Sequence, residues 1–394
     1  MIMHRFTLLT AGHFATASLL LMASQTASAA TMLSQLNDTG VTPKQCYQLN
    51  STALVACTSP KAKALNKFQD GMMGRDTKTA TNSKIDGLLG FGFTKMSSTG
   101  APLPVTASNW ACVRDNITGL IWENKTSDFG LHDGFNSYTH FSASADMTQE
   151  TDVGSFVKAV NKEKLCGASD WQLPSAQELE SIVDYGVAYP GPTIDAAFFP
   201  NTQPKSYWAS EYFVGVTDDV SQHGWVVTFD VGFVDDSNLK WASAVRLVRH
   251  SAVQTANRYV PSADGQEVKD NKTQLIWRRC AEGMKWSANT CVGEATAMTH
   301  EAALQQATKQ ATSTVAWRLP NVRELFSIID NSVGLPAVDN KIFPATPSEI
   351  FWSSSPNVAN LNVNSAWYVA FDDGDVNDDV RSNAFMVRLV RDGK

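Results

Sequence analysis

The chain has 394 residues, of which 43% are hydrophobic and 18% are charged, a composition typical of globular domains. Its 39 acidic and 32 basic residues give a net charge of −7, which argues against a nucleic-acid partner because phosphates require a basic surface. At roughly 100 to 200 residues per domain, the length predicts about two to three domains.

Residues 1–29 have the pattern of a secretory signal peptide. His4 and Arg5 precede an apolar run, and Ala27-Ser28-Ala29 matches an A-x-A cleavage site. The run is too short and too often interrupted by polar residues to span a membrane, and no later stretch is apolar enough. We therefore expect a mature chain without a transmembrane segment that is secreted, periplasmic or exposed at the cell surface.

Residues 30–105 are rich in polar residues and glycine and have little apolar periodicity. We predict an irregular N-terminal segment that ends in a strand. Either it packs on the first repeat, or it is a flexible spacer.

Six cysteines fit an oxidising compartment. They allow 15 pairings, and the simplest connectivity joins neighbours along the chain. This gives the disulfides Cys46–Cys57, Cys112–Cys166 and Cys280–Cys291. A metal site is disfavoured, because no CxxC motif occurs and histidine is scarce.

The stretch 171–184, WQLPSAQELESIVD, recurs at 317–330 as WRLPNVRELFSIID, with eight of fourteen positions identical. Each copy predicts a short helix with Ser175 or Asn321 at the N-cap. Glu178 or Glu324, three residues later, completes a capping box. The chain therefore contains two copies of one folding unit.

The copies extend over residues 106–250 and 258–394. Each begins with two strands around a polar turn, at 113–122 and 268–277. Helices are predicted at 152–161 and at about 301–309, followed by the repeated helix and then by several short strands. The last strands, 245–249 and 387–391, both read VRLVR. This order predicts an α+β fold in which each unit has two short helices and a short-stranded, mainly antiparallel sheet.

These motifs resemble a known family. The joint occurrence of W-x-LP-x3-EL-x-SI-x-D, FP-x-T, an aromatic-Trp-x-Ser step and VRLVR in both copies is similar to the Lcl C-terminal domain family of bacterial secreted domains. The resemblance covers about residues 106–394. It implies two tandem C-type-lectin-like domains, a fold also found in formylglycine-generating enzymes, and a surface binding role in adhesion.

No catalytic constellation is recognised. Formylglycine-generating enzymes bind copper through a late cysteine pair, and no cysteine follows Cys291. His132 and His140 lie in a loop, where a polar loop is favoured over a metal site. For Glu178 and Glu324 we prefer a structural role, either helix capping or pairing with Arg246 and Arg388 of the closing strands.

Binding residues are sought where the copies differ. Trp171, Trp317, Trp225 and Trp367 recur at motif positions, which indicates scaffold. Tyr368 stands opposite Val226, and Trp241 stands where the second copy has Asn383. Ligand-binding residues are therefore predicted to be Tyr368, Trp241, Asn357, Asn360, Asn362 and Asn364, with aromatic faces for sugar rings and amides for their hydroxyl groups.

Asp373, Asp375 and Asn377 alternate as at the start of a calcium loop. A solvated hairpin turn with Asp-Gly at its tip is the simpler interpretation. Calcium is the only cofactor that we consider.

Together these observations predict a secreted or surface-exposed protein that binds a glycan or a surface protein ligand without catalysis. The alternatives are an envelope or appendage component and an enzyme of unknown type on the same scaffold.

Overall fold

The computed structural model describes residues 36–78, 81, 86–140, 152–214, 222–250, 257–358 and 364–393. The predicted signal peptide, Asn360 and Asn362 lie outside these ranges. All described residues belong to one compact unit, residues 32–394. None of the helices within these ranges has the length and apolar character needed to cross a bilayer.

An N-terminal segment precedes the repeats. It contains β1 (Cys46–Tyr47), β2 (Leu54–Val55), α1 (Pro60–Leu65), the 3-10 turn η1 (Asp70–Met72) and β3 (Phe93–Met96).

The elements of the two repeats follow one another in the same order. The first repeat contains β4 (Cys112–Asp115), β5 (Leu120–Glu123), β6 (Tyr138–Thr139), α2 (Val153–Glu163), η2 (Leu165–Gly167), α3 (Ala176–Glu180), β7 (Ser206–Tyr212), β8 (His223–Thr228), β9 (Val234–Asn238), β10 (Ala242–Ser243) and β11 (Val248–His250). The second contains β12 (Tyr259–Pro261), β13 (Glu267–Asp270), β14 (Leu275–Arg278), β15 (Lys285–Ser287), β16 (Thr290–Val292), β17 (Met298–Thr299), α4 (His300–Gln310), α5 (Val322–Phe326), β18 (Ile350–Pro356), β19 (Ser365–Ala370), β20 (Val376–Val380), β21 (Ala384–Phe385) and β22 (Val390–Asp392).

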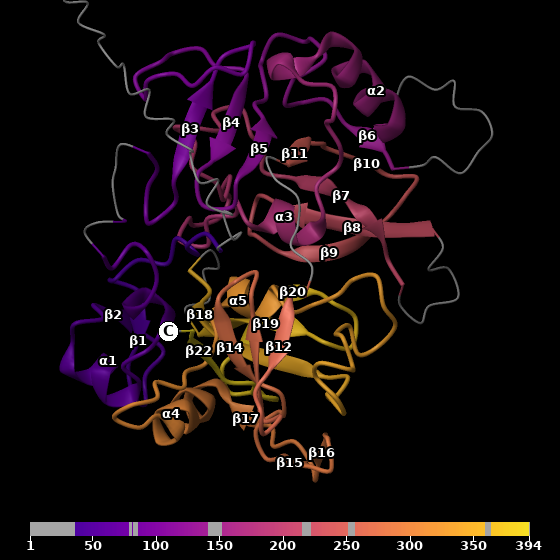
Figure 1. The fold of residues 1–394 in the computed structure, drawn as a ribbon. Coiled ribbons are helices and arrows are strands. Elements are labelled where there is room, and N and C mark those ends of the chain that lie inside the picture. The colour runs from indigo at the N-terminus through magenta and orange to yellow at the C-terminus, as the bar shows by residue number, and fades with distance from the viewer. Residues whose placement is uncertain are drawn as a thin grey trace, which may run out of the picture. The chain divides into compact units, whose positions relative to one another are not determined.

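Each repeat builds the same set of small sheets. One is a four-stranded sheet, β11-β5-β4-β3 in the first repeat and β12-β13-β14-β22 in the second. Another is a two-stranded pair, β10-β6 or β17-β21. The remaining three strands of each repeat join edge to edge in a six-stranded sheet of order β18-β19-β20-β9-β8-β7 (Figure 1). All pairings between named strands are antiparallel, so the predicted α+β class with mainly antiparallel sheets is confirmed.

The junction of the six-stranded sheet pairs Val376 with Val234. These residues occupy equivalent positions in the two repeats, so the same strand edge is used on each side. Both side chains are fully buried in the central core. The repeats therefore share one core across the junction.

The predicted capping boxes are present. The side chain of Ser175 accepts from the N–H of Glu178, and the Glu178 carboxylate accepts from the N–H of Ser175. Asn321 and Glu324 form the same pair of hydrogen bonds.

The alternative pairing of these glutamates with the closing-strand arginines is wrong. Glu178 contacts His250 at 2.6 Å, and Glu324 contacts Arg318 at 2.6 and 2.7 Å. Arg246 and Arg388 are instead fully buried and donate to backbone carbonyls and to the hydroxyls of Thr202 and Thr346. The closing strands turn these arginines inward, away from the helix entrances.

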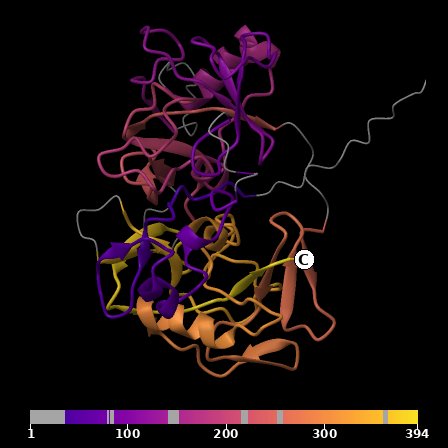
Figure 2. The same ribbon diagram turned by 90° about the vertical axis from the view of Figure 1, so that its left-hand side faces the viewer.

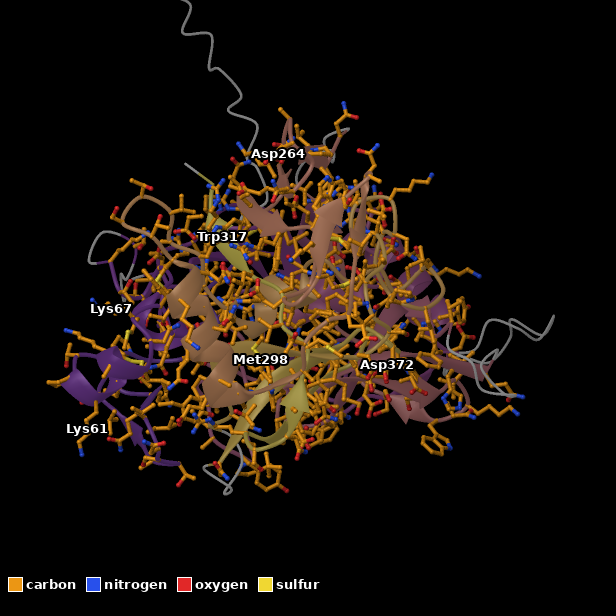
Figure 3. The ribbon with its side chains drawn as sticks, turned by 90° about the horizontal axis from the view of Figure 1, so that it is seen from below. Lys61, Lys67, Asp264, Met298, Trp317 and Asp372 are labelled. Atoms are coloured by element: carbon orange, nitrogen blue, oxygen red, sulfur yellow. A yellow bond between two sulfur atoms is a disulfide. The ribbon has the colours of Figure 1, made fainter. Side chains whose placement is uncertain are left out.

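The recurrent tryptophans form the core, as predicted. Trp171, Trp225, Trp317 and Trp367 are at most 5% exposed. Trp208 and Trp352, also equivalent, donate their indole N–H groups to the carbonyls of Tyr138 at 2.7 Å and Met298 at 2.9 Å. Met298 and Trp317 are labelled in the view of the second repeat in Figure 3. These side chains are scaffold and do not line an open site.

Arg323 of α5 connects the two repeats and the N-terminal segment. Its side chain is 1% exposed and pairs with Glu180 of α3, itself 2% exposed, at 3.2 Å. The same guanidinium donates to the carbonyl oxygens of Asp38, Glu180 and Val183. Because a buried charge needs a partner, this contact defines how α5 meets α3.

The N-terminal segment packs on the second repeat. Asn66 donates to the carbonyl of Leu304 in α4 at 2.7 Å, and Tyr47 and Leu65 belong to the core formed by α4 and β18. Figures 1 and 2 show β1, β2 and α1 beside α4. Strand β3 joins the sheet of the first repeat.

The three predicted disulfides are all present: Cys46–Cys57 in the N-terminal segment, Cys112–Cys166 in the first repeat and Cys280–Cys291 around the β15–β16 hairpin.

We expect Arg323→Met to destabilise the protein by about 3 to 5 kcal/mol, because it leaves Glu180 buried without its counter-charge. Urea unfolding measures this. As the control, Arg249→Ala removes the exposed pair with Asp170 and should cost about 1 kcal/mol or less. Equal effects of the two substitutions would contradict the role given to Arg323.

Asp70, in the N-terminal segment, should make the stability of the folded protein depend on pH. Burial, together with the charges of Asp38 and Glu324, raises its pKa to about 7, despite hydrogen bonds from Ser355 and Thr39. The folded state therefore holds a proton that the unfolded state releases near pH 3.8, so stability should fall as the pH rises from about 4 to about 7. Asp70→Asn should reduce this slope in melting curves recorded across that range. An unchanged slope would show that Asp70 is ionised in the folded protein.

Candidate ligand-binding site

The exposed aromatic side chains of the described residues all lie in the first repeat. They are Phe129 (95% exposed), Trp241 (68%), Phe135 (67%), Tyr189 (58%) and Tyr212 (48%). Aromatic rings left in water at this level mark contact surfaces more often than single exposed aliphatic residues do.

Tyr212 contacts a buried histidine, His140, and Trp241 immediately precedes the strand that pairs beside it. The backbone N–H of His140 donates to the carbonyl of Leu239 at 3.0 Å, two residues before Trp241. Strand β10, which starts after Trp241, pairs with β6, which ends before His140. The ring of Tyr212 meets the ring of His140 edge to face at 5.2 Å. One exposed ring thus contacts the imidazole, and a second exposed aromatic residue lies beside its strand.

His140 has an unused hydrogen-bond acceptor. Its side chain is 7% exposed, and Nε2 donates to the carbonyl of Ala209 at 2.9 Å. Nδ1 is buried and has no partner. Burial lowers the pKa of His140, so the ring is neutral and Nδ1 carries a free lone pair.

In the second repeat the equivalent acceptor is satisfied. His300 donates from Nε2 to the carbonyl of Ser353 at 2.9 Å, and its Nδ1 accepts from Nε of Arg381 at 3.1 Å. Arg381 is the equivalent of Leu239 in the first repeat. The carbonyl of Arg381 accepts from the N–H of His300, just as the carbonyl of Leu239 accepts from the N–H of His140. An aliphatic side chain at that position leaves His140 without its donor.

The second repeat also differs in what covers the histidine. Tyr47 of the N-terminal segment meets His300 edge to face at 5.2 Å, and its hydroxyl donates to the carbonyl of Ser365. The Cζ atom of Arg381 lies 3.7 Å from the centre of the Tyr47 ring. Tyr47 is fully buried, whereas Tyr212, which makes the matching contact with His140, is 48% exposed. The face around the histidine is closed by the N-terminal segment in one repeat and bordered by the half-exposed ring of Tyr212 in the other.

The predicted binding residues do not form one site. Trp241 lies in the first repeat, whereas Tyr368, Asn357 and Asn364 lie in the second. Tyr368 is partly buried against Trp352 and Phe385. Asn357 is 2% exposed, and the carbonyl of Asn364 accepts from the N–H of Arg381.

Tyr212 and His140 were missed as binding residues. Tyr212 lies two residues after the aromatic-Trp-x-Ser step, where the second copy has Pro356. An aromatic residue at a position that differs between the copies was therefore a signal that the sequence offered for Tyr212. The open acceptor of His140 has no signal in the sequence, because it depends on Leu239 from a distant strand.

The proposed calcium residues lie next to acidic residues of the first repeat. Burial, Asp373, Asp235 and Asp236 raise the pKa of Asp375 to about 9. Burial also raises the pKa of Asp373, whose Oδ1 accepts from the N–H of Asp375. Asn377 uses its side-chain oxygen to accept from the N–H of Asp378. Within the described ranges, no three His, Cys, Asp or Glu side chains are grouped so as to hold a metal ion.

The geometry around His140 is suited to binding. Two partly solvent-exposed rings offer flat apolar surface, and the neutral imidazole offers one acceptor. The buried carboxylates of Glu180 and Asp70 serve structural contacts.

No curated protein matches the chain. The Lcl C-terminal domain matches it twice, at residues 111–249 and 266–391, which together cover more than half of the chain. The chain therefore belongs to the Lcl C-terminal domain family and contains two tandem copies of that domain.

Proposed function

We propose that this protein binds a carbohydrate through the first repeat, with Trp241, Tyr212 and His140 as the contact residues. One observation carries the proposal: the exposed ring of Tyr212 contacts a histidine whose acceptor nitrogen has no partner, and the exposed Trp241 immediately precedes the strand that pairs beside that histidine. The role that we propose is adhesion to a glycan-bearing surface.

The chemistry of the three side chains favours a neutral sugar. The apolar face of a pyranose ring fits the flat face of an indole or phenol ring, and its hydroxyl groups donate hydrogen bonds. A few polar groups among aromatic residues are typical of small-ligand sites. The net charge of −7 disfavours strongly anionic ligands.

A ligand reaches His140 by displacing Tyr212. The Nδ1 atom is buried, but the Tyr212 ring that meets His140 is 48% exposed. Turning this ring away from the imidazole and onto the ligand opens the edge of the imidazole without disturbing the central core. A sugar hydroxyl then takes the place that Nε of Arg381 has beside His300.

The second repeat is assigned no glycan in this proposal. Its histidine acceptor is occupied by Arg381, and the ring of Tyr47 covers it. One chain then binds one ligand at the described surfaces, and avidity requires more than one chain.

We expect Trp241→Ala to weaken glycan binding by about tenfold or more, because truncating an aromatic anchor costs about 2 kcal/mol at a contact centre. A glycan array on the mature chain identifies the ligand, and titration calorimetry measures the loss. Tyr189→Ala, which removes another exposed ring of the first repeat, is the matched control and should bind normally. Loss in the control but not in Trp241→Ala would overturn the assignment.

We further propose calcium at Asp373, Asp375 and Asn377. The raised pKa values of Asp373 and Asp375 support this, since adjacent carboxylates that repel one another gain from a cation between them.

If calcium binds there, millimolar calcium should raise the unfolding temperature and release protons near pH 8, because Asp375 must ionise to coordinate. Asp375→Asn should abolish both effects. An unfolding temperature that is the same in calcium and in a chelator would exclude the site.

A further inference from the structure

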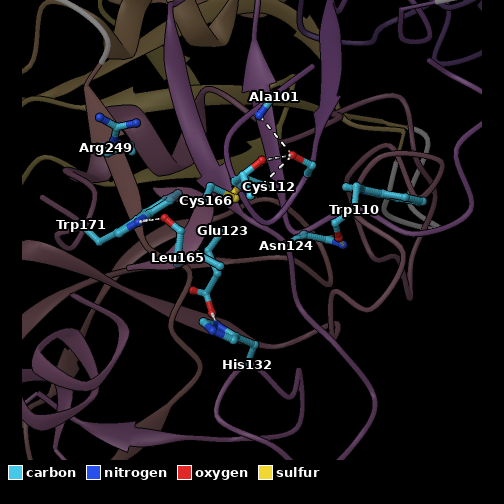
Figure 4. Close-up of a disulfide and its surroundings, with 12 residues drawn as sticks. Ala101, Trp110, Cys112, Glu123, Asn124, His132, Leu165, Cys166, Trp171 and Arg249 are labelled. Atoms are coloured by element: carbon cyan, nitrogen blue, oxygen red, sulfur yellow. Dashed lines mark hydrogen bonds and ion pairs between the residues drawn. A yellow bond between two sulfur atoms is a disulfide. The ribbon is translucent and has the colours of Figure 1, made fainter. Parts of the chain in front are cut away.

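His132 lies between two carboxylates of the first repeat. Its Nδ1 is 2.7 Å from Oε1 of Glu123 in β5, and its Nε2 contacts Oε1 of Glu163 near the end of α2. Figure 4 shows the contact between His132 and Glu123. Glu123 is fully buried, and the side chain of Glu163 is 44% exposed.

These two contacts require a protonated ring. An ionised carboxylate only accepts hydrogen bonds, and a neutral imidazole has one N–H to donate. Both contacts exist together only when both ring nitrogens carry hydrogen. The geometry itself therefore specifies the imidazolium form.

The charges around His132 favour that form. The groups that face it or its partners are Glu123 from β5, Glu163 from α2, Asp128 from its own loop, and Lys125 and Arg246, which contact Glu123. Burial lowers the pKa of His132, but the hydrogen bonds and charges of Glu123 and Glu163 outweigh it and raise the pKa above the ordinary 6.5. Lys125 and His132 in turn hold the pKa of the buried Glu123 at about 2.

His132 belongs to the loop 126–136, which we call the Phe129 loop. It carries Phe129 and Phe135, exposed by 95% and 67%, and it leads into β6 beside the proposed site. The loop is ordered by its own hydrogen bonds. Thr126 donates to the carbonyl of His132 at 2.9 Å, and Gly134 donates to the carbonyl of Thr126 at 2.9 Å. Phe129 has a positive φ of 60°, a conformation that a large side chain adopts only when its surroundings hold it.

The second repeat has a contact at the same place that does not titrate near neutral pH. Arg278 stands at the position of Glu123 and Gln310 at that of Glu163, and Nη2 of Arg278 donates to Oε1 of Gln310 at 3.0 Å. Arginine keeps its charge at every physiological pH. The proton-dependent contact is therefore a feature of the first repeat.

We propose that Glu123, His132 and Glu163 form a proton-dependent clasp that ties the Phe129 loop to α2 and opens when His132 loses its proton. A role of the clasp in regulating ligand binding depends on the function proposed above. Its role in holding the Phe129 loop does not depend on that function.

Deprotonation should break the outer contact. Glu123 is fully buried and cannot turn into water, so the neutral ring keeps its hydrogen on Nδ1. Nε2 then turns a lone pair toward Glu163, which is partly exposed and can move into water. Because the pKa of His132 is raised, the clasp is complete below pH 6.5 and is lost as the pH rises through the higher pKa of the folded state.

Hydrogen exchange of the intact chain tests the clasp. After correction for intrinsic rates, the amides of Thr126 and Gly134 should exchange several-fold faster at about pH 9 than at about pH 6, on either side of the expected histidine titration. Glu163→Ala should make them exchange fast at both pH values. Glu163→Gln should keep them protected at both, because an amide either accepts from or donates to Nε2. Gln310→Ala, the matched change in the second repeat, should leave the Phe129 loop unchanged.

Proton NMR of the His132 ring gives an independent readout. Its pKa should lie above 6.5 in the intact chain and fall in Glu163→Ala. A pKa at or below 6.5, or loop exchange that ignores both pH and Glu163, would overturn the proposal. Both measurements are made without a ligand. A negative result would therefore reject the clasp without bearing on glycan binding.

Discussion

The guanidinium of Arg323 is the contact on which the arrangement of the repeats depends. It is buried where α5, α3 and the N-terminal segment meet, and it pairs with a carboxylate that is equally buried. A buried charge tolerates few alternative geometries, because moving either partner leaves an unpaired ion. With α3 and α5 held in this way, β9 and β20 pair through Val234 and Val376 and complete the six-stranded sheet. Tandem domains joined only by a linker would have no such constraint.

Within this shared scaffold, a few substitutions separate the two repeats. His140 and His300 make the same contacts with backbone, but Leu239 and Arg381 leave one acceptor free and satisfy the other. The covering ring comes from the same repeat in one case and from the N-terminal segment in the other. Likewise, Glu123 and Glu163 hold a histidine where Arg278 and Gln310 hold each other. The first repeat thus combines exposed rings with an open histidine acceptor and a histidine held between two carboxylates, whereas the second is closed.

The features that were predictable from the sequence are those set by local or repeated patterns. The capping boxes, the buried tryptophans, the α+β class and the disulfides follow from spacing and duplication. The partners of Glu178 and Glu324 were only partly predictable, because the inward turn of Arg246 and Arg388 depends on carbonyls from other strands. The packing of Tyr47 on the second repeat was not predictable, since His300 lies 253 positions further along the chain (300 − 47). Asn357 shows the same limit, because an amide in a polar loop proves to be 2% exposed.

The central claim is that ligand meets the first repeat around His140 and does not meet the second. Hydroxyl-radical footprinting of the mature chain, with and without the glycan that gives the strongest array signal, tests this most directly. Our account predicts that Trp241 and Tyr212 become protected by the glycan while Tyr368 and Phe385 do not change. Protection of Tyr368 with no change at Trp241 would contradict it.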